Sequence, residues 1–362
     1  MKVLFVPDYT GGNPYQANLA AALDADVTYG REGSRLPVVA ALLAGDVAVL
    51  HIHWLNTFLG GDTRHGTALR CTLLVVRLLA AKLTGTAVVW TVHNVTMHER
   101  EYPWLEYWFK RAFVRIGVCD RLLVHCDWAA DALLATLDLP ESVRDRVDVV
   151  PHGHYIDSYP NDRSRAEARD SLGIDESATV FLFFGLIRRY KGVTDLVDAF
   201  RAADLPDARL VVAGNPETDA LERELRERAR PDDRIHTAFE FVPDEAVQTY
   251  MNAADAVVLP FRRVTTSGSA VLALSFGRAL VVPPVGCLPE LLDERGTVFY
   301  DSDEERALAG ALEAAADRDL SAMGEHNLTL AGEYGWDGIA DRTTEAYARA
   351  IGEPVETAPA TA

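Results

Sequence analysis

The chain is poor in lysine and cysteine and has no long uninterrupted apolar segment. Its 362 residues include only 4 lysines, against 31 arginines, and 4 cysteines. The cysteines show neither CxxC spacing nor paired histidines at metal-ligand distance, so no metal site is predicted. The most apolar stretch, residues 69–90, is interrupted by three cations and a glycine, which excludes it as a membrane-spanning helix.

Positive charge is scarce overall and unevenly distributed. The formal net charge of −19 argues against nucleic acid as the main ligand, because a phosphate backbone requires a basic surface. Scarce lysine with abundant Asp, Glu and Ala is typical of proteins that stay soluble in high salt, and we interpret it as a halophilic signature. Residues 64–121 are the exception, with 9 basic and 4 acidic side chains. A positive region on an acidic protein usually faces an anionic partner.

Length and apolar content predict two domains. A chain of 362 residues with 49% hydrophobic side chains exceeds the usual size of a single core. The apolar run at 3–6 follows Met1-Lys2 directly and is interpreted as a first strand, not as a signal peptide. The expected location is therefore the cytoplasm, either free or peripheral on the inner face of the cell membrane.

Short apolar runs alternate with helical periods, which predicts an α/β fold of two doubly wound parallel sheets covered by helices. The predicted strands of the first set lie at 3–6, 47–52, 88–92 and 121–125. Those of the second set lie at 180–184, 209–212, 235–238, 256–259 and 280–282. Ligands of such sheets bind where the carboxyl ends of the strands meet.

The domain boundaries follow from the same pattern. We expect an N-terminal domain over 1–156 and a C-terminal domain over 157–335, with the polar segment 157–169 as the linker between them. A last helical pattern covers 336–351. Residues 352–362 are rich in Pro, Thr and Ala and are expected to fray.

The segment 181–194 carries the strongest functional signal. Its apolar run ends at Gly185, and Arg188, Arg189 and Lys191 follow before a helical pattern opens. A helix start directs free N–H groups and a positive dipole end toward one point, and cations beside it predict a binding site for a phosphorylated ligand. The alternative is a solvated basic loop.

Further glycine and hydroxyl turns fall on the same predicted edge. A Gly-Asn pair follows the apolar run 210–213, and Thr-Thr-Ser-Gly-Ser at 265–269 opens a helix. Such residues cap a helix and also let a phosphate or sugar approach its backbone, although capping alone explains one of them. The segment 285–290 is the last of these predicted turns. The predicted ligand-binding residues are Gly185, Arg188, Lys191, Gly192, Gly214, Asn215, Thr266, Ser267, Gly268, Ser269 and Glu290.

Histidines gather at the predicted strand ends of the first half. His51 and His53 end one strand, His93 follows another, and His98 and Glu99 lie in the next loop. Histidine and glutamate are the side chains best suited to take a hydroxyl proton near neutrality, so His93, His98 and Glu99 are candidate catalytic bases. The alternative is that these histidines only form structural hydrogen bonds.

The order of these motifs resembles the GT-B glycosyltransferases of the large nucleotide-sugar superfamily over nearly the whole chain. The resemblance is strongest to the bacterial GDP-mannose:glycolipid β-mannosyltransferases of xanthan-type polysaccharide assembly. The shared elements lie at 13–15, 50–54, 91–94, 98–99, 152–155, 184–188, 190–193, 212–216, 267–268 and 273–275.

This resemblance implies a fold of two Rossmann-like domains facing across a cleft, with the terminal helix packed back on the first. It implies transfer of a sugar onto a lipid-linked saccharide or other glycan. The expected sugar is mannose, and the expected donor is GDP-mannose. Arg188 and Lys191 would neutralise the donor diphosphate in place of a metal ion, and no cofactor beyond the nucleotide-sugar substrate is expected. The first domain would supply the base and the acceptor site.

One departure from the wider superfamily bears on stereochemistry. Its retaining members carry two glutamates eight positions apart, and Val264 and Leu272 stand at those positions here. This difference favours transfer with inversion. A retaining transferase, a sugar-nucleotide epimerase of the same fold, and a non-catalytic sugar-nucleotide-binding partner of another transferase remain open alternatives.

The segment 104–115 mixes aromatic and cationic residues at helical spacing within the positive region. Such a helix can rest on an anionic membrane surface with Trp and Tyr at the level of the headgroups. The alternative is a core helix with a basic outer face.

Overall fold

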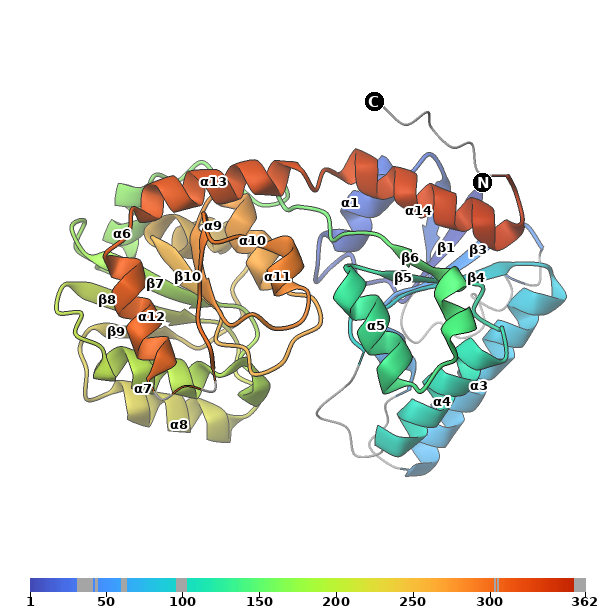
Figure 1. Ribbon diagram of the computed structural model, residues 1–362, viewed down its shortest axis with the longest axis horizontal. Coiled ribbons are helices and arrows are strands. Elements are labelled where there is room, and N and C mark those ends of the chain that lie inside the picture. Colours follow the sequence, from blue (N-terminus) through green and yellow to red (C-terminus); the bar gives the residue numbers. More distant parts are fainter. Residues whose placement is uncertain are drawn as a thin grey trace. The chain divides into compact units, whose positions relative to one another are not determined.

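The computed structural model describes residues 1–30, 42, 45–59, 64–95, 103–302, 304 and 306–354. The chain divides into two compact units (Figure 1). Unit 1 comprises residues 1–153 and 336–362, and unit 2 comprises residues 154–335. The first boundary therefore falls after Gly153, three residues before the predicted one.

Unit 1 contains a parallel sheet of six strands in the order β2-β1-β3-β4-β5-β6. Every pairing is parallel, as the alternation of strands and helices predicted. The carboxyl ends of all six strands therefore lie along one edge. The strands are β1 (Lys2–Val6), β2 (Asp26–Tyr29), β3 (Val49–Ile52), β4 (Ala87–Thr91), β5 (Arg121–Val124) and β6 (Val147–Val149).

Helices cover both faces of this sheet. The crossovers through α3 (Arg64–Leu83), α4 (Pro103–Arg115) and α5 (Asp127–Thr136) each move one strand in the same direction, so right-handed connections place these helices on one face. On the other face, α1 (Tyr15–Ala22) and α14 (Trp336–Ile351) contact each other (Figure 1). Short 3₁₀ turns lie at Leu55–Phe58 and Glu141–Arg146.

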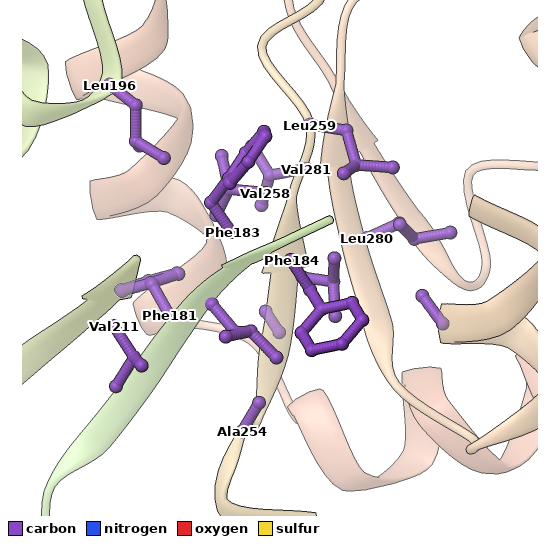
Figure 2. Packing of buried hydrophobic residues seen from close by; sticks show 14 of the residues in the cluster. Phe181, Phe183, Phe184, Leu196, Val211, Ala254, Val258, Leu259, Leu280 and Val281 are labelled. Atoms are coloured by element: carbon purple, nitrogen blue, oxygen red, sulfur yellow. The ribbon is translucent and has the colours of Figure 1, made fainter. Parts of the chain in front are cut away.

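Unit 2 repeats this architecture with the strand order β12-β11-β10-β7-β8-β9, again all parallel. Figure 2 shows Phe181, Phe183 and Phe184 of the central strand within its core, together with Val211, Val258 and Val281. These side chains form a near-continuous apolar run because helices cover both faces of the sheet. The strands are β7 (Thr179–Phe184), β8 (Ala208–Ala213), β9 (Ile235–Ala238), β10 (Ala256–Val258), β11 (Ala279–Val282) and β12 (Thr297–Phe299).

The helices of unit 2 follow the predicted alternation. A 3₁₀ turn at Arg189–Lys191 leads directly into α7. The helices are α6 (Arg165–Leu172), α7 (Val193–Ala202), α8 (Asp219–Ala229), α9 (Asp244–Ala253), α10 (Gly268–Ser275), α11 (Leu288–Leu291), α12 (Ala307–Ala316) and α13 (Leu320–Gly332).

The prediction that 157–169 is a linker is wrong at its carboxyl end, where α6 begins. Ser164 and Glu167 form a capping box, with each side chain bonded to the backbone of the other residue. Arg169 is buried and donates to four carbonyl groups and to Asp255. A polar composition suggested solvent exposure, but the guanidinium is satisfied by buried backbone oxygens.

Candidate functional site

In unit 2, the turns after β7 and β8 are in direct contact. Gly185 and Gly214 both have left-handed backbone angles, with φ of 119° and 144°. A β-carbon at position 214 would lie only 1.8 Å from the carbonyl oxygen of Gly185. The two turns also bond through Ile187, whose N–H donates to the carbonyl of Asn215 at 3.0 Å. Glycine is therefore required where these two loops meet.

The turn after β7 brings a hydroxyl and an ammonium group together. A β-carbon at Gly185 would lie 3.0 Å from Ser269 Oγ and 3.9 Å from Lys191 Nζ. Lys191 forms no ion pair with a carboxylate among the described residues, and burial, followed by the charge of Arg188, lowers its pKa to about 8. Position 192, next to this lysine, requires glycine, because a side chain at 192 would collide with the carbonyl of Pro260.

The start of α10 adds hydrogen-bond donors to this cluster. Ser267 caps the helix, its Oγ accepting from the N–H of Ala270. The N–H groups of Gly268 and Ser269 have no acceptor in the part of the chain that the structure describes. They belong to the first turn, where the helix dipole favours an anion.

Three further predicted residues lie in loops and a helix of unit 2. Thr266 is half-buried and its hydroxyl donates to Cys287 Sγ at 3.6 Å. The loop that holds Thr266 is tied to the next loop, because Cys287 N–H donates to the carbonyl of Thr265 at 2.9 Å. Glu290 is exposed and lies in α11, and the side chain of Asn215 is exposed after β8.

The cations of the predicted phosphate site do not all lie together. Arg188 is partly buried, donates to the carbonyls of Ile187 and Asn215 at 3.0 and 3.4 Å, and pairs with Glu217 at 3.7 Å. Arg189 is exposed and pairs instead with Glu224 of α8 at 3.1 Å. The interpretation of all three cations as one cluster is therefore wrong for Arg189, whose guanidinium pairs with a carboxylate of α8.

In unit 1, histidines follow four neighbouring strands at the same sheet edge. His53 follows β3, His93 follows β4, His125 follows β5 and His152 lies just after β6. Their side chains gather around the buried ring of Tyr15, with ring centroids 4.9–5.9 Å from it. Parallel strands bring these residues together because their carboxyl ends share one edge.

Hydrogen bonds link three of these rings in a row. His53 Nδ1 lies 3.3 Å from His93 Nε2, and His93 Nδ1 lies 3.2 Å from His125 Nε2. The row ends at the carbonyl of Val150, 2.9 Å from His125 Nδ1. His51 forms a separate set, with Thr91 at 2.7 Å and with Tyr347 of α14 at 2.6 Å.

Burial keeps these imidazoles uncharged. It lowers the pKa of His51 and His152 to about 3 and that of His125 to about 4, with neighbouring imidazoles adding to the effect at His51 and His152. The pKa values of His53 and His93 lie well below 6.5 for the same reasons. The expectation of a base near neutrality rested on the ordinary pKa of histidine, which burial changes.

The other two predicted bases, His98 and Glu99, lie outside the described residues. His125 and His152 were not predicted as site residues, although each follows an apolar strand run as His53 and His93 do. That shared position was a usable signal. Within the described residues, no three His, Cys, Asp or Glu side chains are arranged to hold a metal ion.

Comparisons with known proteins agree with this architecture. Residues 178–318 match the family described as Glycosyl transferases group 1. The chain is 28% identical over 306 residues to GDP-mannose:glycolipid 4-beta-D-mannosyltransferase of Xanthomonas campestris pv. campestris, which covers 83% of this chain and 79% of the relative. It is 32% identical over 252 residues to D-inositol 3-phosphate glycosyltransferase of Mycolicibacterium gilvum, covering 66% and 54% of the two chains.

Among solved structures, Anabaena Alr3699/HepE in complex with UDP and glucose matches with a TM-score of 0.72 at 17% identity, over 95% of this chain and 98% of that one. The two parallel six-stranded units thus define the GT-B class of fold. Residues 178–318 form a group 1 glycosyltransferase domain, and the chain is a glycosyltransferase, as the order of its motifs predicted.

Proposed function

We propose that this enzyme moves a sugar from a nucleotide-diphosphate donor, in the first place mannose from GDP-mannose, onto a lipid-linked saccharide or other glycan. The observation that carries the proposal is the cluster of the Lys191 ammonium, the Ser269 hydroxyl and the first-turn N–H groups of α10. Two comparisons support it: the Xanthomonas relative is named for GDP-mannose and a glycolipid, and the Anabaena structure contains UDP and glucose.

Breaking the bond between sugar and phosphate leaves negative charge on the departing diphosphate. Lys191 supplies a full positive charge beside the turn after β7, and the start of α10 supplies N–H donors and the positive end of a dipole. Arg188, three residues before Lys191, adds a guanidinium, which lies 3.7 Å from the carboxylate of Glu217. These groups stabilise the leaving group without a metal ion, and the proposed reaction is therefore metal-independent.

The proposed stereochemistry is inversion through one direct displacement. Val264 and Leu272 occupy the positions of the two glutamates of the resembled retaining enzymes, and neither can bond a sugar hydroxyl. Direct displacement requires a base that takes the acceptor proton while the diphosphate leaves from the opposite side. We assign this role to His93, with His98 and Glu99 as the other candidates.

Transfer assays with GDP- and UDP-sugars and extracted lipid acceptors test the proposal. The expected product is a glycolipid whose new anomeric centre, read by NMR, is inverted relative to the donor. Retention would reject the displacement mechanism. Turnover of the donor without any acceptor would indicate the epimerase, and donor binding without transfer would indicate the non-catalytic partner.

The Lys191→Ala variant should lose about 10- to 100-fold in kcat/KM for the donor, because a charge-assisted contact to the leaving group is removed. Arg189→Ala is the matched control, since Arg189 is exposed and paired with Glu224. Because the pKa of free Lys191 is about 8, donor affinity should also weaken as the pH rises through that value. Equal activity of the two variants would contradict the phosphate assignment.

We further propose that α3 and α4 hold unit 1 on an anionic membrane surface, where a lipid-linked acceptor resides. None of the described helices is long and apolar enough to cross a bilayer. On α3, however, Leu69, Val76, Leu79 and Leu83 share one helix face and are 54, 48, 55 and 83% exposed. A stripe of apolar side chains that is exposed to solvent in this way indicates an interaction surface.

The charges near this stripe favour an anionic lipid surface over another protein. α3 contains no acidic residue, and the only one of α4, Glu106, is buried and paired with Lys110 at 2.6 Å. Trp104 and Trp108 of α4 are 52 and 58% exposed on one face, and Arg115 is exposed at its end. Aromatic rings at headgroup level beside cations are typical of peripheral membrane helices.

Co-sedimentation with phosphatidylglycerol vesicles tests this surface. The wild-type protein should bind these vesicles at low salt and not neutral phosphatidylcholine vesicles, and Leu79→Glu should weaken binding about 10-fold or more. Leu328→Glu on α13 of unit 2 is the matched control, because Leu328 is a leucine with 43% exposure. Self-association in the ultracentrifuge that is lost in Leu79→Glu, without vesicle binding, would assign the stripe to a second copy of the chain.

A further inference from the structure

The hydrogen bonds that link the histidines of unit 1 all run in one direction from donor to acceptor. His125 Nδ1 lies 2.9 Å from the carbonyl of Val150, which can only accept a hydrogen bond, so the proton of His125 is on Nδ1. His125 is neutral, and its Nε2 therefore carries a lone pair. That lone pair accepts from His93 Nδ1 at 3.2 Å, which places the proton of His93 on Nδ1 as well.

The same reasoning leaves the basic nitrogen of His93 at Nε2. This atom accepts from His53 Nδ1 at 3.3 Å, so His53 carries its proton on Nδ1. All three tautomers thus follow from a single backbone carbonyl. His53 Nε2 at the far end is buried and has no hydrogen-bond partner among the described residues.

Aromatic packing fixes the plane of the central ring. Trp54 stacks on His93 with ring centroids 4.4 Å apart and planes inclined by 11°. Tyr15 meets the same ring edge-on at 5.0 Å and 86°. A small part of the His93 side chain, 8%, remains exposed, whereas His53 is fully buried. Of the three rings in the row, His53 is therefore the least accessible, whereas His93 and His125, at 8 and 6%, keep a small exposed part.

We propose that His125 is a positioning residue, which holds His93 in the tautomer whose Nε2 can accept a proton from the acceptor hydroxyl. This inference rests on the proposed function of His93 as the base. His53 Nδ1 donates to His93 Nε2 in the structure, so the proposal requires the acceptor hydroxyl to displace that hydrogen bond. Val150 anchors the arrangement through its carbonyl, so no carboxylate is needed.

The proton and electron balance of the step is simple. The acceptor O–H bond breaks and its proton moves to His93 Nε2, while the oxygen forms a bond to the anomeric carbon. The bond from that carbon to the donor phosphate breaks, and its electron pair leaves with the diphosphate. The Nδ1–H of the His93 imidazolium still donates a hydrogen bond to His125 Nε2, which stabilises the new charge.

Two substitutions at His125 separate this role from mere packing. His125→Gln preserves the donor and acceptor roles of both hydrogen bonds, because an amide can donate to Val150 and accept from His93 Nδ1. His125→Leu removes both bonds, which frees the Nδ1 proton of His93. We expect kcat to fall about 100-fold in His125→Leu with an unchanged KM for the donor, and His125→Gln to recover most of this loss.

Nitrogen-15 NMR of histidine-labelled protein reads the tautomers without any activity assay. In the wild-type enzyme and in His125→Gln, Nδ1 of His93 should show a protonated, pyrrole-type shift and Nε2 a pyridine-type shift. In His125→Leu this pattern should be lost. A protonated Nε2 in the wild-type protein, or an identical pattern in His125→Leu, would overturn the assignment.

The His93→Ala variant distinguishes failure of this inference from failure of the proposed function. Full activity in His93→Ala would reject His93 as the base, and with it any catalytic role for His125, even where the NMR pattern is as expected. Loss of activity in His93→Ala together with full activity in His125→Leu would leave the base in place and reject only the positioning role.

Discussion

Unit 1 and unit 2 share one topology but equip the carboxyl edge of their sheets differently. In unit 1 the strands are followed by histidines, among them His93 and His125, and rings fill the edge. In unit 2 the strands β7 and β8 are followed by Gly185 and Gly214, and the edge presents backbone N–H groups and one ammonium. The first edge suits proton transfer and the second suits an anion, although the two scaffolds are alike.

The two edges also differ in charge at neutral pH. Burial holds five imidazoles of unit 1 neutral, those of His51, His53, His93, His125 and His152, because their pKa values lie well below 6.5. Lys191 of unit 2 also has a lowered pKa, but at about 8 it stays mostly protonated at pH 7. Burial lowers the pKa at both edges. It leaves the histidines uncharged, because their ordinary pKa is already 6.5, but Lys191 remains charged, because its ordinary pKa is 10.5.

The comparison predicts that mild acid destabilises unit 1 much more than unit 2. A histidine whose folded pKa is depressed binds fewer protons than its unfolded form between the two values, so stability falls as the pH drops below about 6.5. Between pH 6.5 and pH 5, each fully buried histidine lowers the free energy of unfolding by roughly 2 kcal/mol at most. Five such groups in unit 1 make this the largest effect expected. Among the described histidines of unit 2, only His154 and His236, both partly exposed, have a lowered pKa.

The tryptophans allow the two units to be followed separately. All six lie in unit 1, at positions 54, 90, 104, 108, 128 and 336. Urea unfolding read by tryptophan fluorescence should shift to markedly lower urea between pH 7 and pH 5. The part of the far-UV circular dichroism signal that does not follow tryptophan, which belongs to unit 2, should shift much less. Equal shifts of the two signals would break the comparison.

Much of this fold was predictable, because apolar runs and helical periods alternate clearly in the central strands. The prediction missed β2, β6 and β12, which are short strands at sheet edges. Edge strands bury less surface, so their sequences carry a weaker apolar signal. The parallel sheets and the GT-B class are confirmed despite these gaps.

The candidate site was predictable in its parts and not in its contacts. Glycine after a strand predicted the turn at Gly185, and histidine after a strand predicted His93 as a candidate. The partner of Arg189 could not be predicted, because it depends on the direction in which a 3₁₀ turn points the side chain. Nor could the tautomer of His93, which depends on a carbonyl that lies two strands away at Val150.

A smaller effect sharpens the comparison from the side of unit 2. Gly214→Ala places a β-carbon 1.8 Å from the carbonyl oxygen of Gly185, at a φ of 144°. Overlap with backbone cannot be relieved by a side-chain rotation, so strain and overpacking together should cost roughly 3–5 kcal/mol. The loss should appear in the circular dichroism signal of unit 2, while the tryptophan signal of unit 1 keeps its midpoint.

Gly173→Ala is the matched control, because it tests a left-handed backbone without the overlap. Gly173 follows α6 at a φ of 66°, and a β-carbon there meets no atom within 4 Å. Its cost should be only about 1 kcal/mol, the usual penalty for a left-handed residue that has a side chain. If the two variants lose the same stability, backbone angle alone explains glycine at 214, and contact between the turns is not required. If Gly214→Ala instead shifts the tryptophan signal equally, the two units unfold together and cannot be treated as independent.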